Sequence, residues 1–302
     1  MSSRRNDWRR LAAATWGPPR DPQFYGELDL DAEPILAHID AVRRSTGVRL
    51  TVTHLVGRAV AHALATVPEL RVRMARGHMR RRESVDVFFI VTTGEGHELT
   101  GIKVCDADRK AATEIAGELR ARCASLESGV DPELGRGKAL MAYVPRWLLR
   151  HVLTISAWLT SDLNLDLRRF GLPRQAFGGA MVTSVGMWGI SRAYSPLAAY
   201  YRVPVLVLVG AVRHQPVARD GEVVVRPVLP LTATFDHRYA DGYHAAKFAA
   251  AIGEYCARPG RFEPEPARKE VCHDPLTMGG AADRGGGRLH TGHLPAGRQG
   301  RP

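Results

Sequence analysis

The stretch TFDHRYADGYHAAKF, residues 234 to 248, contains a histidine, His237, four positions before Asp241. An imidazole with a pKa near 6.5 is suited to take a proton from a thiol whose pKa is near 8.5. Charged residues crowd the ring on both sides, and Gly242 lets the chain turn tightly into the next segment. The pattern indicates proton-transfer chemistry. The alternative, at this point, is a buried histidine that only satisfies hydrogen bonds.

The segments around His237 predict how it is positioned. Residues 203–237 are rich in β-type apolar residues and predict two or three strands, with a hairpin turn at Asp220-Gly221. Residues 241–259 predict a closing helix. His237 is therefore expected at the junction between a strand and a helix.

The rest of the chain supplies further helices and strands. The segment 31–47 predicts a helix with Asp31 as a candidate cap, and 51–70 predicts another, capped near Thr53. Residues 71–82 predict two short strands around Gly77, and strands are expected within 84–93 and 177–190. The segment 99–129 predicts a strand, a loop and a helix. This order favours an α/β domain with a mixed sheet.

Residues 132–170 predict one long helical segment whose apolar part is about as long as a membrane span. Pro145, Arg146, Arg150 and His151 interrupt it near the middle. Two arginines there argue against a spanning helix. An amphipathic helix on the protein surface, or at a subunit contact, is favoured over contact with a membrane surface.

Composition points to an anionic partner. The 302 residues carry a formal net charge of +11, which favours phosphate-bearing ligands such as coenzyme A or, alternatively, describes only a solvated basic surface. The most basic run, residues 71–82, lacks interleaved aromatic residues and any recognisable nucleic-acid motif. We therefore expect no nucleic-acid partner.

Cysteine usage and the chain ends give the remaining expectations. Cys105, Cys123, Cys256 and Cys272 form no CxxC pair, which predicts free thiols in a reducing compartment and no metal site. The basic N-terminal residues lack a signal-peptide apolar run, so the expected location is the cytoplasm. Residues 261–302, rich in Gly, Pro and Arg, predict a disordered tail.

Several segments, taken in order, resemble one family. FDHRYADG resembles the HxxxDG signature of the catalytic domain of dihydrolipoyl acyltransferases, the second component of 2-oxoacid dehydrogenase complexes, which chloramphenicol acetyltransferase shares. TVTHLVGRAVAHALATVPEL, VCDADRKAATEIAGEL, FGGAMVTSVGMWGI and the strands leading into His237 also resemble this family. The resemblance extends over about residues 30–258.

The resemblance implies a fold and a reaction. The fold is a two-layer α/β sandwich with a mixed sheet, assembled as a homotrimer or higher oligomer. The active site is a channel between subunits that admits coenzyme A and dihydrolipoamide from opposite ends. His237 is then the general base that takes the proton from the incoming thiol, and acyl-CoA is a substrate.

The family's oxyanion donor is a serine hydroxyl in the glycine-flanked strand. Aligning GMWG with the family's Gly-Met-Phe-Gly places Thr183 at that serine. Counting from Gly178-Gly179 instead places Ser184 there, so both remain candidates, with Thr183 preferred.

The resemblance gives the neighbouring charged residues supporting roles. Asp241 is implied to pair with an arginine from the N-terminal segment, for which Arg9 and Arg10 are candidates. Arg238 is expected in a structural ion pair and His244 in a structural position. No residue is singled out for binding the cofactor.

The chain then divides into a basic segment at 1–30, a catalytic domain at 31–260 with a helical insertion at about 132–170, and the tail from 261, of which the domain and its insertion follow from the resemblance. We expect a form without a lipoyl domain, so a lipoyl-borne acyl group would come from another protein, such as a lipoylated partner or 2-oxoacid dehydrogenase subunits. VTTGEGHELTGIKV lacks the family's Pro-Asp-Gly-Leu turn, so the resemblance does not predict the form of the acyl pocket.

Two alternatives remain beside this enzyme. One is a non-catalytic trimeric scaffold or adaptor that keeps the fold for assembly. The other is an acyltransferase that acts on an unrelated acceptor. Retention of both His237 and a hydroxyl at position 183 or 184 argues against the scaffold.

Overall fold

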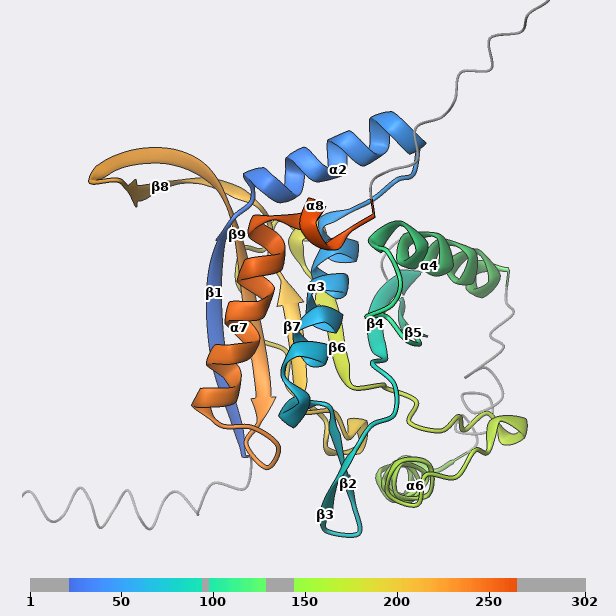
Figure 1. Ribbon diagram of the computed structural model, residues 1–302. Helices are drawn as coiled ribbons and strands as arrows, with labels where there is room; N and C mark the ends of the chain where they lie inside the picture. Colours follow the sequence, from blue (N-terminus) through green and yellow to red (C-terminus); the bar gives the residue numbers. More distant parts are fainter. Residues whose placement is uncertain (1–21, 94–97, 129–143, 265–302) are drawn as a thin grey trace, which may run out of the picture. The chain divides into compact units, whose positions relative to one another are not determined.

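The computed structural model describes residues 22–93, 98–128 and 144–264. These residues form one seven-stranded sheet in the order β1-β9-β7-β6-β4-β5, with β8 paired to β9 (Figure 1). Pairing is parallel from β4 through β6 to β7 and antiparallel elsewhere, so the predicted mixed sheet is confirmed. The strands are β1 (Gln23–Asp31), β4 (Val87–Thr93), β5 (Glu98–Val104), β6 (Ala180–Ser184), β7 (Val205–Val209), β8 (Arg213–Arg219) and β9 (Glu222–Asp236).

One face of the sheet is covered by helices. These are α2 (Glu33–Thr46), α3 (Val52–Thr66), α4 (Ala112–Glu127), α7 (Gly242–Ala257) and the short α8 (Pro259–Phe262). Alternation along each strand sends every second side chain, such as Val205 and Val207, into the main core beneath them. Gly57 of α3 lies against Phe89 of β4, where a Cβ would meet the ring at 2.2 Å, so the helix packs closely on the sheet.

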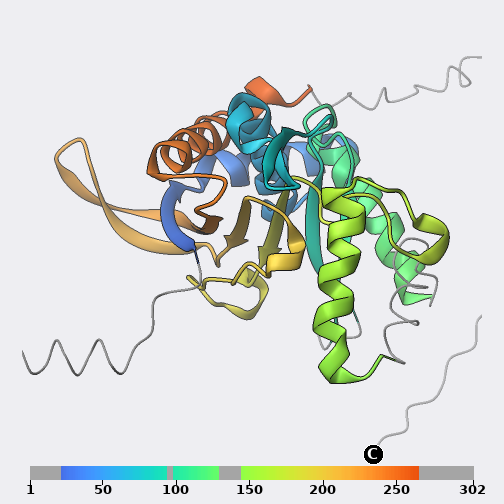
Figure 2. The same cartoon turned by 90° about the horizontal axis from the view of Figure 1, so that it is seen from below.

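A different set of side chains occupies the opposite face. Phe88, Met181 and Leu206 form a second, smaller cluster there. Figure 2 shows α6 (Arg146–Ala157) on the side of the sheet away from α3 and α7. The helix continues into a π-helical turn, η3 (Trp158–Asp162). The insertion thus covers part of a face that the other helices leave open.

Two local predictions near the N-terminus need correction. Residues 23–30 were assigned to the basic segment before the catalytic domain, but they belong to β1, whose Phe24, Leu28 and Leu30 face the core at alternate positions. The cap of α3, predicted near Thr53, lies two residues earlier at Thr51, whose hydroxyl accepts from the N–H of His54. The predicted short strands appear as β2 (Val72–Ala75) and β3 (His78–Arg81).

The predicted helix at 132–170 is wrong in extent. Residues 129–143 lie outside the described part of the chain; within the described part, residues 144 and 145 are not helical and α6 begins at Arg146. It ends at Asp162, close to Asn164, which takes a left-handed φ of 58°. A short 3-10 turn (Arg168–Phe170) follows. A residue with positive φ cannot continue a right-handed helix.

The predicted tail begins too early. Residues 259–262 form α8, and the buried carboxylate of Glu263 accepts a hydrogen bond from the N–H of Ala112 at 2.7 Å. The remainder of the predicted tail, and the basic segment before residue 22, lie outside the described residues. No helix within the described ranges is long and apolar enough to cross a membrane.

Candidate functional site

His237 follows β9 directly and its side chain is exposed. The backbone N–H of His237 donates to the carbonyl of Pro22 at 2.6 Å. Its ring meets the ring of Phe24 edge-on, with centroids 5.2 Å apart. The alternative of a buried histidine is therefore wrong: this imidazole is held by its backbone and by Phe24 while its surface stays accessible.

An ion pair between the residues on either side of His237, Asp236 and Arg238, holds this loop in place. The carboxylate of Asp236 is buried, and it accepts from Nε of Arg238 at 3.0 Å and from Nη2 at 2.6 Å. The hydrogen bond to Asp236 is the main cause that raises the pKa of Arg238. Arg238 is thus placed in the structural ion pair expected for it.

Asp241 begins α7 as its N-cap. Its carboxylate accepts from the N–H of Tyr243 at 3.0 Å and of His244 at 3.2 Å, and the ring nitrogen Nδ1 of His244 lies 2.7 Å from the same oxygen. The backbone hydrogen bond from His244 is the largest of the effects that lower the pKa of Asp241. Asp241 and His244 therefore fix where the helix starts. The predicted arginine partners, Arg9 and Arg10, lie outside the described residues.

Thr183 and Ser184 close β6 and face opposite sides of the sheet. Ala180 and Val182 belong to the core under the helices, whereas Met181 belongs to the cluster on the other face. Alternation places Thr183 on the face of Met181 and Ser184 on the helix side. The hydroxyl of Ser184 lies 3.4 Å from the carbonyl of Val209, to which it donates. Thr183 is the better placed of the two to meet a ligand on the open face.

Strand pairing separates Thr183 from His237 within one chain. Thr183 pairs with Leu208 of β7, which pairs with Thr232 of β9. From Thr232 to His237 the chain runs about 16 Å along the strand, and two strand spacings add about 10 Å across the sheet. The two Cα atoms are thus roughly 19 Å apart. A single chain cannot place both groups on one small reacting centre.

A cavity of about 470 Å³ lies on the face of the sheet that carries α6. Its floor includes Phe88, Ile90 and Met181 from the sheet. The insertion and the chain that follows it supply the remaining wall, which includes Leu153, Ser156, Ala157, Thr160, Leu172, Phe177, Tyr200 and Tyr201. Sequence reasoning missed these residues as a site. The apolar residues of the insertion were a signal that it packs against something. The sequence did not indicate which part of the sheet they face.

None of the cysteines that the structure describes lines the cavity. Cys256 is a buried free thiol, and Cys272 lies outside the described residues. Burial raises the pKa of Cys256 to about 12. Among the residues that the structure describes, no group of three or more His, Cys, Asp or Glu side chains gathers as a metal site would require.

Comparison with known proteins gives a family match over most of the chain. The model of the catalytic domain of 2-oxoacid dehydrogenases acyltransferase matches residues 14–129 and 171–262. A curated relative, the dihydrolipoyllysine-residue acetyltransferase component of the pyruvate dehydrogenase complex of Pseudomonas aeruginosa, is 26% identical over 79% of this chain and 36% of its own length. The chain spans less than half the length of the curated relatives that it matches.

Solved structures share the fold. A probable dihydrolipoamide acetyltransferase from Listeria monocytogenes is 18% identical with a TM-score of 0.59, covering 88% of this chain and 94% of that chain. The dihydrolipoamide acetyltransferase of Azotobacter vinelandii is 21% identical with a TM-score of 0.58, over 80% and 84%. A chloramphenicol acetyltransferase is 13% identical with a TM-score of 0.50, over 85% and 96%. The predicted fold class is confirmed.

Proposed function

The chain belongs to the family of 2-oxoacid dehydrogenase acyltransferase catalytic domains, and we propose that it transfers an acyl group between coenzyme A and a thiol such as dihydrolipoamide, with His237 as general base. The exposed imidazole at the end of β9 is the observation that carries this proposal. In a histidine buried within the core, the ring nitrogens would instead be occupied by hydrogen-bond partners.

His237 acts on the incoming thiol. Its imidazole removes the S–H proton, and the thiolate attacks the carbonyl carbon of the acyl-CoA thioester. The tetrahedral intermediate then collapses, the bond from carbon to the coenzyme A sulfur breaks, and the proton on His237 returns to the leaving thiolate. Phe24 and the backbone contact to Pro22 hold the ring in place for both transfers.

Thr183 is proposed as the donor to the oxyanion of that intermediate. Its side chain extends from the open face of β6, and a threonine hydroxyl can donate one hydrogen bond to the developing charge. Because roughly 19 Å separates Thr183 from His237 in one chain, we propose that the two groups meet across the contact between two copies, in a trimer or a larger assembly.

The Azotobacter vinelandii enzyme supports the assignment of roles to His237 and Asp241. The Azotobacter vinelandii enzyme was studied for the roles of one serine, one histidine and one asparagine in its catalytic mechanism, the last two being four positions apart. His237 and Asp241 have the same spacing, with aspartate in place of asparagine. We assign Asp241 to positioning the histidine loop, since it caps α7.

The test is a turnover assay with the purified protein, a panel of acyl-CoAs and free dihydrolipoamide. Wild type is expected to consume at least one acyl-CoA, and His237→Ala is expected to lower the rate by about 10²-fold or more, because the general base is lost. His78→Ala is the matched control, since His78 is an exposed histidine on β3.

Two results would oppose the proposal. Equal rates for wild type and His237→Ala would remove the catalytic role and favour the scaffold alternative. Consumption of acyl-CoA that depends on His237 but not on dihydrolipoamide would keep the base and exclude this acceptor.

A further inference from the structure

The cavity between α6 and the sheet has a wall that the family match does not account for. The matched residues stop at 129 and resume at 171. Leu153, Ser156, Ala157 and Thr160, which line the cavity, come from the unmatched segment. The substrate preference of the family therefore cannot be transferred to this wall, and its own chemistry must be considered.

The lining favours an uncharged group. None of the lining residues, all within the described part of the chain, carries a formal charge. The hydroxyls of Ser156 and Thr160 donate to backbone carbonyls of the preceding turn, at 2.9 Å and 2.8 Å. Burial is the main cause that raises the pKa of Tyr200, which keeps that phenol neutral. Apolar cavities of about 300–1,000 Å³ are typical of small-molecule sites.

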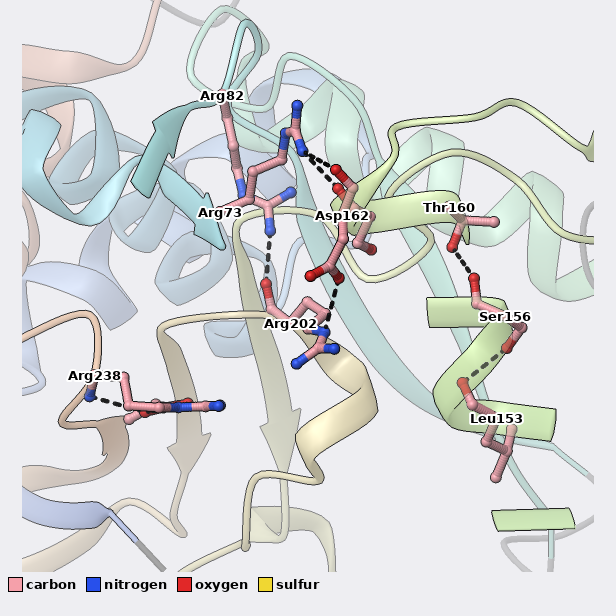
Figure 3. Close-up of polar contacts among 10 residues, drawn as sticks. Arg73, Arg82, Leu153, Ser156, Thr160, Asp162, Arg202 and Arg238 are labelled. Carbon is pink, nitrogen blue, oxygen red and sulfur yellow. Dashed lines mark hydrogen bonds and ion pairs between the residues drawn. The ribbon is translucent and has the colours of Figure 1, made fainter. Parts of the chain in front are cut away.

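A polar network fixes this wall to the rest of the domain (Figure 3). Nη1 of Arg73 donates to the carbonyl of Ser161 at 2.6 Å, and Arg202 pairs with the carboxylate of Asp162 at 3.2 Å. The buried guanidinium of Arg82 donates to the carbonyl of Arg202 at 2.7 Å. The C-terminal end of the insertion is thus held against β2 and the segment before β7. These contacts hold the end of the wall that Ser161 adds to the cavity.

The floor of the cavity adjoins the proposed oxyanion donor. Met181 lines the cavity, and Thr183 lies two residues farther along the same strand on the same face. The two Cα atoms are about 7 Å apart. A carbonyl held at the Thr183 hydroxyl would direct its hydrocarbon substituent within reach of the cavity. The phosphates of coenzyme A would find no cationic partner among the lining residues.

We propose that this cavity holds the hydrocarbon part of the acyl group, so that a medium-length chain such as octanoyl is preferred to acetyl. The proposal rests on the proposed function, since it takes the thioester to be the substrate. Each buried methylene is worth about fourfold in affinity. Even partial burial of the additional carbons of octanoyl gives about tenfold or more.

The test measures binding without turnover. Octanoyl-CoA and acetyl-CoA are titrated calorimetrically into the assembled full-length His237→Ala protein and into wild type. Octanoyl-CoA is expected to bind at least about tenfold more tightly than acetyl-CoA in both. A failure of His237-dependent turnover would count against the proposed function alone, because this readout requires no chemistry.

Variants on α6 localise the effect. Ala157 is 7% exposed and lines the cavity, whereas Ile155, on the same helix, is 56% exposed and does not. Ala157→Phe is expected to abolish the preference for octanoyl-CoA over acetyl-CoA, and Ile155→Phe is expected to keep the preference. Ser156→Phe fills the same space and serves if Ala157→Phe fails to fold.

Two outcomes would overturn the proposal. The first is equal affinity for the two thioesters, or binding of neither, in folded protein. The second is a chain-length preference that survives filling the cavity at both position 156 and position 157. Loss of the preference at those positions with retention in Ile155→Phe would support it.

Discussion

At the scale of single residues, the arrangement separates the groups that we propose to react from the groups that hold the loop around them. His237 leaves its imidazole exposed, while Asp236 and Asp241 on either side form hydrogen bonds within the loop. Thr183 and Ser184 are neighbours in sequence but belong to opposite faces of the sheet. Removing each of these two adjacent hydroxyls is therefore expected to affect the reaction differently.

Thr183→Val removes the hydroxyl with little change of shape and should lower kcat by about 10²- to 10³-fold, because one oxyanion donor is lost. Ser184→Ala should leave kcat nearly unchanged, since that hydroxyl donates to the carbonyl of Val209. Thr183→Ser restores a donor and is the control. Steady-state kinetics of acyl transfer decide the matter, and a large loss in Ser184→Ala alone would assign the role to Ser184.

At the scale of elements, the start of α3 depends on a neutral histidine. Nδ1 of His54 accepts from the N–H of Thr51 at 3.2 Å, completing a reciprocal cap. Burial, followed by the charge of Arg120, lowers the pKa of His54 from 6.5 to about 4. The folded state thus resists a proton that the unfolded chain accepts. The associated stability is complete above pH 6.5 and is lost as the pH falls toward 4.

His54→Gln keeps an acceptor at the third position of α3 but does not titrate. Between pH 7 and pH 5, wild type should lose about 2 kcal/mol of unfolding free energy more than the variant. Urea unfolding at both pH values measures the difference. The other histidines are common to both proteins, so parallel pH dependences would show that His54 is not the responsible group.

Periodic patterns predicted the elements on either side of His237. β9 shows a run of apolar β-type residues, and α7 shows a helical apolar stripe that begins directly at Gly242. β1 was missed because the basic residues before it dominated the interpretation, although Phe24, Leu28 and Leu30 alternate. The end of α6 near Asn164 depends on one backbone angle that periodicity does not encode.

At the scale of the whole molecule, the order of the strands determines how far apart Thr183 and His237 lie in one chain. The sequence gives no strand order, so it could not indicate that Thr183 lies toward one end of the sheet and His237 at the other. The relation of the two groups required the pairing of β6, β7 and β9. It leads to a test that uses two inactive proteins.

Co-expression of His237→Ala with Thr183→Val should recover activity that neither variant shows alone. In a cyclic assembly mixed at random, about one site in four receives an intact histidine from one copy and an intact threonine from the next. Separately purified homo-oligomers, combined without subunit exchange, are the control. Activity no higher than that of the variants would mean that the two groups do not act together across a subunit contact.

The span between β6 and the end of β9 has a consequence for how the protein behaves at low abundance. If the two groups meet only between copies, a folded monomer would carry His237 and Thr183 at separate surfaces and would have no complete active site. Dilution would then abolish activity without unfolding the protein, and the self-association constant would set the lowest concentration at which the protein is active.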